Sequence, residues 1–175
     1  MKADTIAILP FSEQHTQGVV DVILAIQRAE FGVPVTLADQ PDLLDIQNYY
    51  QTGRGNFWLA LHAGDVVGTL CLLDIGNRQA ALRKLFVKAP FRGPKLGVAH
   101  RLMDALLEWG ALRGVGEIYL GTTAQYRAAH RFYEKRGFLE IPKADLPEAF
   151  PVMSVDSKFY TYVISALTIQ DGDLP

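Results

Sequence analysis

Apolar residues in the first half of the chain follow the patterns of a short strand, two helices and a group of strands. The chain is expected to begin with a strand at Ile6–Leu9 and a helix that Ser12 caps and that extends to about Glu30. A loop over Phe31–Gln40 then leads to a second helix, which starts at Pro41 and stops at Gly53. The expected strands that follow are Phe57–His62, Val66–Leu73 and Ala80–Lys88, with a turn over Asp74–Gln79 before the last of them. The first two strands of that group are expected to form a hairpin, because a turn containing Gly64 and Asp65 separates them.

The second half alternates helices and strands. Its clearest element is a helix that opens near Leu96 and ends by Gly114, because apolar residues recur there at helical spacing. The other expected elements are a strand at Ile118–Thr122, a helix at Ala124–Arg136, a strand at Phe138–Ile141, a Pro-bearing loop over Pro142–Met153, and a last strand at Phe159–Ile164.

The resulting order, β-α-α-β-β-β-α-β-α-β-β, combines antiparallel hairpins with strand–helix–strand units. It predicts an α/β protein with a mixed sheet and helices on both faces. The chain has 175 residues and no linker or internal repeat, so we expect one domain over residues 1–175, with a loose tail at 165–175.

Composition narrows the class of protein. Apolar residues make up 49% of the chain, but no apolar run approaches the ~20 residues of a membrane helix, and the first residues lack a signal-peptide pattern. We therefore expect a cytoplasmic protein without a membrane partner. Cys71, the one cysteine, is expected to be a buried thiol rather than a nucleophile. The four histidines are dispersed, so no metal site is expected.

Positive charge gathers in one segment of an acidic chain. The net charge is −2, which argues against a nucleic-acid binder. Six of the 17 basic residues nevertheless lie between Arg83 and Arg101, with no Asp or Glu among them. Two interpretations are open: a solvated basic face, or a site for an anionic ligand.

The segment from Arg92 to Gly97 favours the anionic ligand. It lies between an expected strand and an expected helix, and it contains Gly93 and Gly97. A helix start leaves backbone N–H groups unpaired, and glycines let a phosphate approach them. The P-loop pattern is excluded, because no Lys-Ser/Thr pair follows the glycines, and the dinucleotide pattern GxGxxG is missing.

Two stretches resemble the GNAT superfamily of N-acetyltransferases. LRKLFVKAPFRGPKLGVAHRLM resembles the strand, R/Q-x-x-G-x-G/A loop and helix of that family, and AAHRFYEKRGF resembles its late helix. The resemblance extends from the first strand to the last. It implies a mostly antiparallel sheet of about seven strands and an acyltransferase that uses acetyl-CoA as co-substrate, with no metal.

The resemblance also implies roles for individual residues. Phe86 and Val87 would offer backbone groups to the pantetheine arm, and Tyr133 would protonate the departing thiolate, although it could instead be a core aromatic beside Phe132. The other residues implied to contact the cofactor are Arg92, Gly93, Pro94, Lys95, Leu96, Gly97, Val98 and Ala129. Pro94 has no N–H group, so it can only shape the loop.

Three residues depart from the family pattern. Lys95 replaces the first glycine of the loop motif, and Tyr126 replaces an Asn that often begins the late helix. Ala81 occupies the strand position where many relatives carry a Glu that acts as base. The base therefore has to come from elsewhere; the candidates are Glu30, Glu117, Asp156 and His130, each of which could also be purely structural.

The acceptor is expected to be a small or amino-acid-like amine, with a peptide or protein amine as an alternative. The segments Phe31–Gln40 and Pro142–Met153 are expected to line its site. A non-catalytic acyl-CoA sensor is a second hypothesis, motivated by Ala81 and Lys95. No nucleic-acid partner is expected, and a homodimer is compatible with the sequence.

Overall fold

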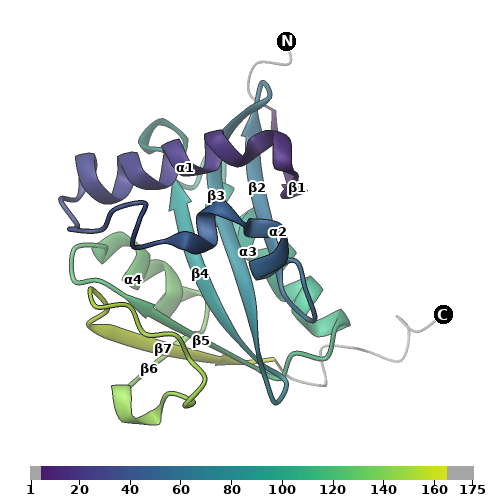
Figure 1. The fold of residues 1–175 in the computed structure, drawn as a ribbon, viewed down its shortest axis with the longest axis vertical. Helices are drawn as coiled ribbons and strands as arrows, with labels where there is room; N and C mark the ends of the chain where they lie inside the picture. The colour runs from purple at the N-terminus through teal and green to yellow at the C-terminus, as the bar shows by residue number, and fades with distance from the viewer. Residues whose placement is uncertain (1–4, 165–175) are drawn as a thin grey trace.

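A seven-stranded sheet organises the protein (Figure 1). The computed structural model describes residues 5–164, so the expected tail at 165–175 lies outside the described residues. The strands are β1 (Ile6–Pro10), β2 (Asn56–His62), β3 (Asp65–Gly76), β4 (Gln79–Val87), β5 (Glu117–Thr122), β6 (Leu139–Ile141) and β7 (Lys158–Val163), in the spatial order β1-β2-β3-β4-β5-β7-β6. All neighbouring strands are antiparallel except β4 and β5. The predicted mixed, mostly antiparallel sheet is confirmed.

Helices cover both faces of the sheet. They are α1 (Thr16–Leu24), α2 (Ile46–Tyr50), α3 (Val98–Leu112) and α4 (Arg127–Lys135), with short turns η1 (Glu13–His15), η2 (Ala25–Glu30), η3 (Pro41–Leu44), η4 (Ala89–Phe91) and η5 (Lys143–Asp145). The η2 turn is π-helical and continues α1. In Figure 1, α1 and α2 lie in front of the sheet and α3 lies behind it. Within residues 5–164, no helix is long and apolar enough to cross a membrane.

Each helical layer packs on its own apolar core. The α3 side buries Leu102, Met103 and Leu106 against the sheet, because these residues share one face of the helix. The α1 side buries Val19 and Ile23 against the other face. The sheet is therefore apolar on both sides, as expected for a layer between two layers of helices.

The second helix differs from the prediction. The segment expected to be one helix from Pro41 to Gly53 forms η3 and α2 as separate turns, since Asp45 adopts a non-helical φ of −148°. The η3 turn buries Asp42, whose carboxylate accepts the Tyr50 hydroxyl at 2.5 Å. A buried polar contact therefore sets the local geometry in place of a continuous helix.

Several element boundaries also differ from the predicted ones. The turn expected over Asp74–Gln79 shrinks to Asn77 and Arg78, both with positive φ, which is the geometry of a two-residue hairpin turn. Helix α3 starts two residues later than Leu96, and α4 starts at Arg127 rather than at Ala124. Ser12 precedes η1, but its side chain makes no capping hydrogen bond.

Candidate active site

The parallel strands β4 and β5 separate after a short pairing. They pair at Gln79–Glu117, Ala80–Ile118 and Ala81–Tyr119, and not beyond. The rest of each strand diverges from the other, which opens a splay in the middle of the sheet (Figure 1). Two pockets meet there, and Leu85, Phe86, Tyr126 and Ala129 line both.

The first pocket, here called the helix pocket, lies between the start of α3 and the helix α4. Gly97 is the N-cap of α3 and has φ +58°, and Gly93 has φ +103°, a region that L-residues rarely adopt. The N–H groups of Val98, Ala99 and His100 have no backbone acceptor among residues 5–164. This helix start can therefore bind an anion, as the sequence indicated.

Lys95, which stands where the family motif has its first glycine, fits the backbone of this loop. The positive φ angles of the loop fall on Gly93 and Gly97, whereas Lys95 is absent from the non-glycine residues with positive φ. Its side chain is exposed. A lysine is thus compatible with the backbone at the position where the family motif has its first glycine.

Most of the predicted cofactor residues line the helix pocket. The ones that do are Phe86, Val87, Arg92, Gly93, Pro94, Gly97 and Ala129. Leu96 packs on the core beneath α3 and Val98 is buried, while Lys95 lies outside the pocket lining. Positive charge on this pocket comes from α4 as well, through Arg131 and Lys135.

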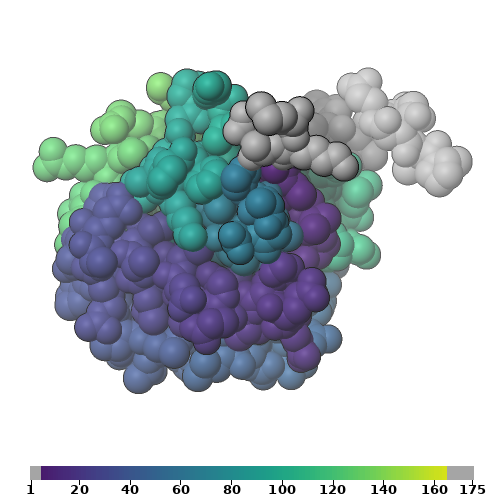
Figure 2. Space-filling view, turned by 90° about the horizontal axis from the view of Figure 1, so that it is seen from above, coloured from purple at the N-terminus to yellow at the C-terminus, as the bar shows by residue number. Residues whose placement is uncertain are grey.

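Arg92 joins the loop to the end of the N-terminal helical segment. Its guanidinium forms an ion pair with Glu30 through two contacts, and its Nε donates to the Val87 carbonyl at 2.7 Å. The guanidinium also lies 5.7 Å from the centre of the Phe31 ring. Seen from above, the purple and indigo N-terminal segment and the teal loop after β4 lie side by side (Figure 2).

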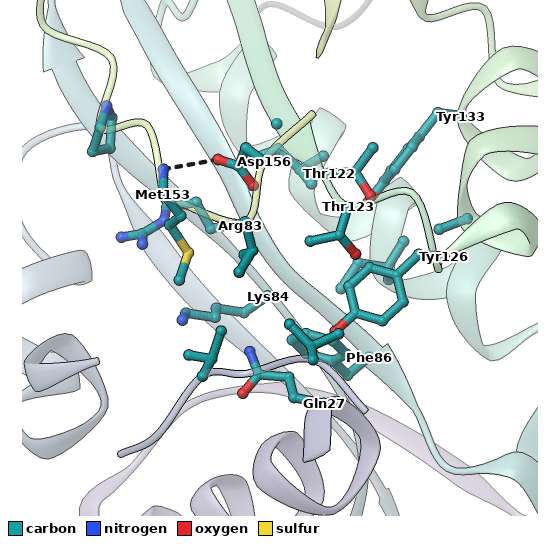
Figure 3. Close-up of a pocket in the computed structure, with 18 of the residues that line it drawn as sticks. Gln27, Arg83, Lys84, Phe86, Thr122, Thr123, Tyr126, Tyr133, Met153 and Asp156 are labelled. Atoms are coloured by element: carbon teal, nitrogen blue, oxygen red, sulfur yellow. Dashed lines mark hydrogen bonds between the residues drawn. The ribbon is translucent and has the colours of Figure 1, made fainter. Parts of the chain in front are cut away.

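The second pocket, here called the loop pocket, lies on the α1 side of the splay (Figure 3). Val33 and Val35 line it from one loop, and Phe150, Pro151 and Met153 from the other. Both segments that the sequence assigned to an acceptor site, Phe31–Gln40 and Pro142–Met153, thus contribute to one pocket.

Tyr133 lies where the two strands separate. It lines the loop pocket and packs against Phe138 and Tyr160, with ring centres 5.6 and 5.8 Å away. Burial raises the pKa of the Tyr133 hydroxyl, with smaller contributions from Tyr160 and Tyr126, so the group stays protonated at neutral pH. Tyr133 is therefore a core aromatic that borders a pocket and carries a protonated hydroxyl.

Two hydroxyl groups of this site were not assigned a role from the sequence. The hydroxyl oxygens of Thr123 and Tyr126 are buried and have no hydrogen-bond partner among residues 5–164, and both residues line the loop pocket. Figure 3 shows the two side chains next to each other on the pocket wall. Helical spacing was the available signal for one of them, because Tyr126 precedes Tyr133 by seven residues.

Three of the four candidate bases lie outside the loop pocket. Glu30 is engaged by Arg92, which lowers the pKa of its carboxyl mainly through hydrogen bonds. Glu117 accepts the Tyr119 hydroxyl at the opposite end of β5, and His130 Nε2 contacts the Thr123 carbonyl at 2.9 Å. Each of the three therefore has a structural role.

Asp156 is the candidate base that does line the loop pocket. One carboxylate oxygen accepts the Met153 N–H at 2.9 Å. The carboxylate also packs against Gly121, where an added Cβ would lie 2.7 Å from Oδ2. Burial raises the pKa of the Asp156 carboxyl above its usual value. Ala81, the position of the usual family Glu, is fully buried and can supply no proton acceptor.

The basic run from Arg83 to Arg101 is not one surface. Arg83 and Lys84 line the loop pocket, whereas Arg92 lines the helix pocket. Lys84 is only 7% exposed. The interpretation of the whole run as one anion site is therefore wrong: two of the charges line one pocket, one lines the other, and Lys88, Lys95 and Arg101 line neither.

The remaining expectations concern thiol and metal chemistry. Cys71 is buried, and burial raises the pKa of its thiol to about 12, which confirms the inert buried thiol. Among residues 5–164, no group of three or more His, Cys, Asp and Glu side chains is arranged to hold a metal ion.

Comparisons with known proteins agree with this geometry. The model of the Acetyltransferase (GNAT) family matches residues 20–138. N-acetylaspartate synthetase of Danio rerio is 34% identical over 106 residues, which cover 59% of this chain and 37% of that protein. The matched part of the chain thus spans little more than a third of that relative's length.

Solved structures resemble the chain over nearly its whole length. An acetyltransferase of the GNAT family from Staphylococcus aureus Mu50 has a TM-score of 0.89 at 34% identity and covers 92% of this chain and 100% of its own. The PaiA N-acetyltransferase from Thermoplasma acidophilum, solved in complex with coenzyme A, shares the fold at 15% identity, with a TM-score of 0.68 and coverage of 91% and 99%.

Proposed function

Because this chain belongs to the GNAT acetyltransferase family, we propose that it transfers the acetyl group of acetyl-CoA to a primary amine of a small molecule by direct attack. The observation that carries the proposal is the junction of the two pockets at the β4–β5 splay, with Tyr126 and Ala129 lining both. One pocket offers unpaired N–H groups, which suit phosphates, and the other offers the partly buried carboxyl of Asp156, which suits an amine.

The helix pocket is the site for coenzyme A. Its glycine loop and the start of α3 can surround the pyrophosphate with N–H groups, and Arg131 and Lys135 add positive charge. Phe86 and Val87 lie at the end of β4 beside the splay, where their backbone groups can meet the pantetheine arm. Coenzyme A supplies the thioester that is attacked.

Asp156 is the base for the amine. An alkylammonium has a pKa near ~10, so the amine must lose a proton before it can attack. Asp156 lines the loop pocket, and its raised pKa makes it a better proton acceptor than an exposed aspartate. It takes the proton directly or through one water and later releases it to solvent.

Two further groups act on the thioester. The backbone N–H groups near Phe86 and Val87 stabilise the negative charge that develops on the carbonyl oxygen. Tyr133 donates its proton to the departing sulfur as the C–S bond breaks. The attacking nitrogen loses its second proton as the amide forms, and this proton returns to the tyrosinate directly or through solvent. The products are the amide, the free thiol and one proton, the one that Asp156 took from the ammonium group and releases to solvent.

The acceptor is a small molecule in this proposal, because the loop pocket is bounded by Val33 on one loop and Phe150 on the other. The relative named N-acetylaspartate synthetase supports an amino-acid-like acceptor. A peptide or protein amine is the alternative, in which only one terminal amine would enter between the two loops.

A thiol-release assay with acetyl-CoA and a panel of amines tests the proposal. We expect thiol release that depends on an added small-molecule amine, with the acetylated amine found by mass spectrometry. Thiol release only with peptides would favour the protein-amine alternative. Tight coenzyme A binding without turnover for any amine would contradict the proposal and favour the non-catalytic sensor.

A further inference from the structure

Strand β4 contains a bulge that puts two consecutive cations on one face of the sheet. Arg83 pairs with Cys71, but Phe86 pairs with Thr69, so β4 uses one residue more than β3 over this interval. Lys84 adopts a left-handed φ of +60°, and its carbonyl accepts the Thr69 hydroxyl at 2.7 Å. Regular alternation would send the side chains of Arg83 and Lys84 to opposite faces, whereas here both line the loop pocket.

These two cations share one carboxylate. Asp42 Oδ2 lies 3.9 Å from the Arg83 guanidinium and 3.7 Å from Lys84 Nζ. The three side chains are 12%, 3% and 5% exposed, in the order Arg83, Lys84, Asp42. Neither cation has another acid within 4 Å among residues 5–164. Within that distance two nearly buried cations thus share one acid, and burial lowers the pKa of Lys84. A second anion beside them would offset the cost of burying these charges.

Both cations are held in position and retain donors. The Arg83 guanidinium donates to the Tyr50 hydroxyl at 2.9 Å, which uses one of its five N–H groups. Lys84 donates to the Gln40 side-chain oxygen, and the Gln40 amide is fixed by two hydrogen bonds with Gln27, at 2.9 and 3.1 Å. Both residues line the loop pocket, so their remaining N–H groups are the donors available to an anion there.

The same pocket holds groups for the rest of a ligand. Thr123 is 3% exposed, and within the described part of the chain neither its hydroxyl nor the buried Tyr126 hydroxyl has a hydrogen-bond partner. Asp156 lines the pocket from the loop after β6, across the pocket from Gln27 in Figure 3. The pocket therefore has cations, unpartnered hydroxyls and a carboxylate on its walls, which suits a ligand that carries both an amine and an acid.

We propose that the acceptor is an amino acid whose carboxylate binds to Arg83 and Lys84 while its amine faces Asp156. This inference rests on the proposed function, in which the loop pocket receives the acceptor. It adds the chemical class of the acceptor and the residues that recognise it. The carboxylate supplies the counter-charge that Asp42 alone does not provide.

The first test compares acceptors that differ only in the carboxylate. The twenty standard L-amino acids are assayed by thiol release, beside the carboxamide and the decarboxylated amine of each one that is acetylated. We expect kcat/KM to fall roughly 10- to 100-fold when the carboxylate is lost, since hydrogen bonds to charged groups are the strong ones. Equal rates for acids, carboxamides and simple amines would overturn this inference and leave acetyl transfer to amines intact.

The second test changes the cation. The preference is measured as the ratio of kcat/KM for the acid to kcat/KM for the carboxamide. In Lys84→Gln this ratio should fall toward one, and in Lys84→Arg most of it should remain. Lys88→Gln is the matched control, because Lys88 is exposed and lines neither pocket. A preference that survives in Lys84→Gln and also in Arg83→Gln would overturn the assignment. If melting curves show that the variants do not fold, the comparison of acceptors with the unmodified protein decides whether the acceptor carboxylate is recognised.

A binding experiment separates failure of this inference from failure of the proposed function. If no amine is acetylated, the amino acids and their carboxamides are titrated by calorimetry into the protein saturated with coenzyme A. Binding of acids but not of carboxamides, lost in Lys84→Gln, would support the carboxylate site in a protein without turnover. No binding of either would overturn both proposals.

Discussion

Glu30 and Arg92 are ion-paired across the boundary between the N-terminal helical segment and the loop that follows β4. Arg92 Nη2 lies 2.8 Å from Glu30 Oε2, and the second nitrogen contacts Oε1. The hydrogen bonds to Arg92 are the largest cause of the lowered pKa of the Glu30 carboxyl, and the positive charge of Arg92 adds to them. A carboxylate held in this way orients its partner and is a poor proton acceptor.

We expect kcat/KM to fall at low pH, as the base becomes protonated, and we call this fall the acidic limb of the pH–rate profile. Glu30→Gln should leave this limb in place. The variant loses an ion pair whose two side chains are both about one-third exposed, and such pairs are worth about 0–1 kcal/mol. We expect a correspondingly small change in the free energy of unfolding. The measurement is kcat/KM for the amine between pH 4 and 9. Disappearance of the acidic limb would make Glu30 the base.

Asp156→Asn should remove that limb and slow the reaction. The carboxyl acts as base only when deprotonated, so activity falls as the pH drops through its pKa. Burial raises this pKa, so the limb should lie above the ~3.9 of a free aspartate. We expect kcat to fall by roughly 10²- to 10⁴-fold at neutral pH, the usual contribution of a positioned base. A variant with the original profile would exclude Asp156.

The same substitution should stabilise the fold at neutral pH. A raised pKa in the folded state means that the folded protein binds the proton more tightly than the unfolded chain does, so stability falls as pH rises through this range. Asn removes the partly buried charge and keeps an oxygen that can accept the Met153 N–H. The gain in melting temperature should be present at pH 7 and shrink at pH values below the unfolded pKa.

Asp39→Asn is the control, because it should change the melting temperature at pH 7 in the opposite direction, downward. The Thr36 N–H and hydroxyl lower the pKa of the exposed Asp39 carboxyl, so its contribution to stability is present above the unfolded pKa and is lost as pH falls. A melting temperature that rises in both variants at pH 7 would contradict the assignment of the effect to burial of Asp156.

Tyr133→Phe should slow catalysis and spare cofactor binding. The substitution removes the hydroxyl and keeps the ring, so the packing against Phe138 remains. We expect kcat to fall by roughly 10²- to 10⁴-fold if the hydroxyl protonates the thiolate. Coenzyme A affinity should change by less than about 1 kcal/mol, since at most one hydrogen bond is lost.

Tyr160→Phe is the matched control for this experiment. Tyr160 is fully buried and packs 5.8 Å from Tyr133, but it lines neither pocket. Steady-state kinetics, a coenzyme A titration and a melting curve are needed on both variants. Equal kcat values for Tyr133→Phe and the unmodified protein would remove Tyr133 from the mechanism.

Gly97→Val should weaken coenzyme A binding. Gly97 adopts φ +58°, and a left-handed conformation costs an L-residue about 1–2 kcal/mol, which corresponds to roughly 5- to 30-fold. The nearest atom to an added Cβ is 4.0 Å away, so the effect comes from the backbone rather than from a clash. The loop should leave the geometry that exposes the first N–H groups of α3.

Gly64→Val separates this effect from general strain. Gly64 also has a positive φ, of +86°, and it lies in open space in the β2–β3 turn. Both variants should lose stability in melting curves, but calorimetry should show reduced coenzyme A affinity only for Gly97→Val. Equal affinity in the two variants would exclude the α3 start as the phosphate site.

The sequence predicted the parts of the site that depend on local geometry. Glycine placement before an amphipathic helix predicted the loop at Gly93 and Gly97. Tyr126, Ala129 and Tyr133 stand at i, i+3 and i+7, a spacing that puts residues on one face of a helix. The structure places these three side chains on one pocket wall. Local backbone rules were sufficient because each feature lies within one turn or one helix.

The rest of the site depends on contacts between distant segments. Strand alternation cannot reveal the bulge at Lys84, because a one-residue insertion is defined only by the pairing of β4 with β3. Asp156 could not be separated from the other acids, since its environment comes from Met153 and from Gly121 on β5. The broken second helix likewise follows from the contact between Asp42 and Tyr50.

The early end of the β4–β5 pairing has a consequence for amide hydrogen exchange. Beyond Ala81 and Tyr119, the edges of β4 and β5 that face each other have no neighbouring strand among residues 5–164. Backbone groups on these edges that no side chain binds therefore depend on solvent or on a ligand. A bound coenzyme A arm would occupy the place of the missing strand. The increase in exchange protection on binding should therefore concentrate in residues 82–87 and 120–123, in the middle of the sheet rather than at its rim.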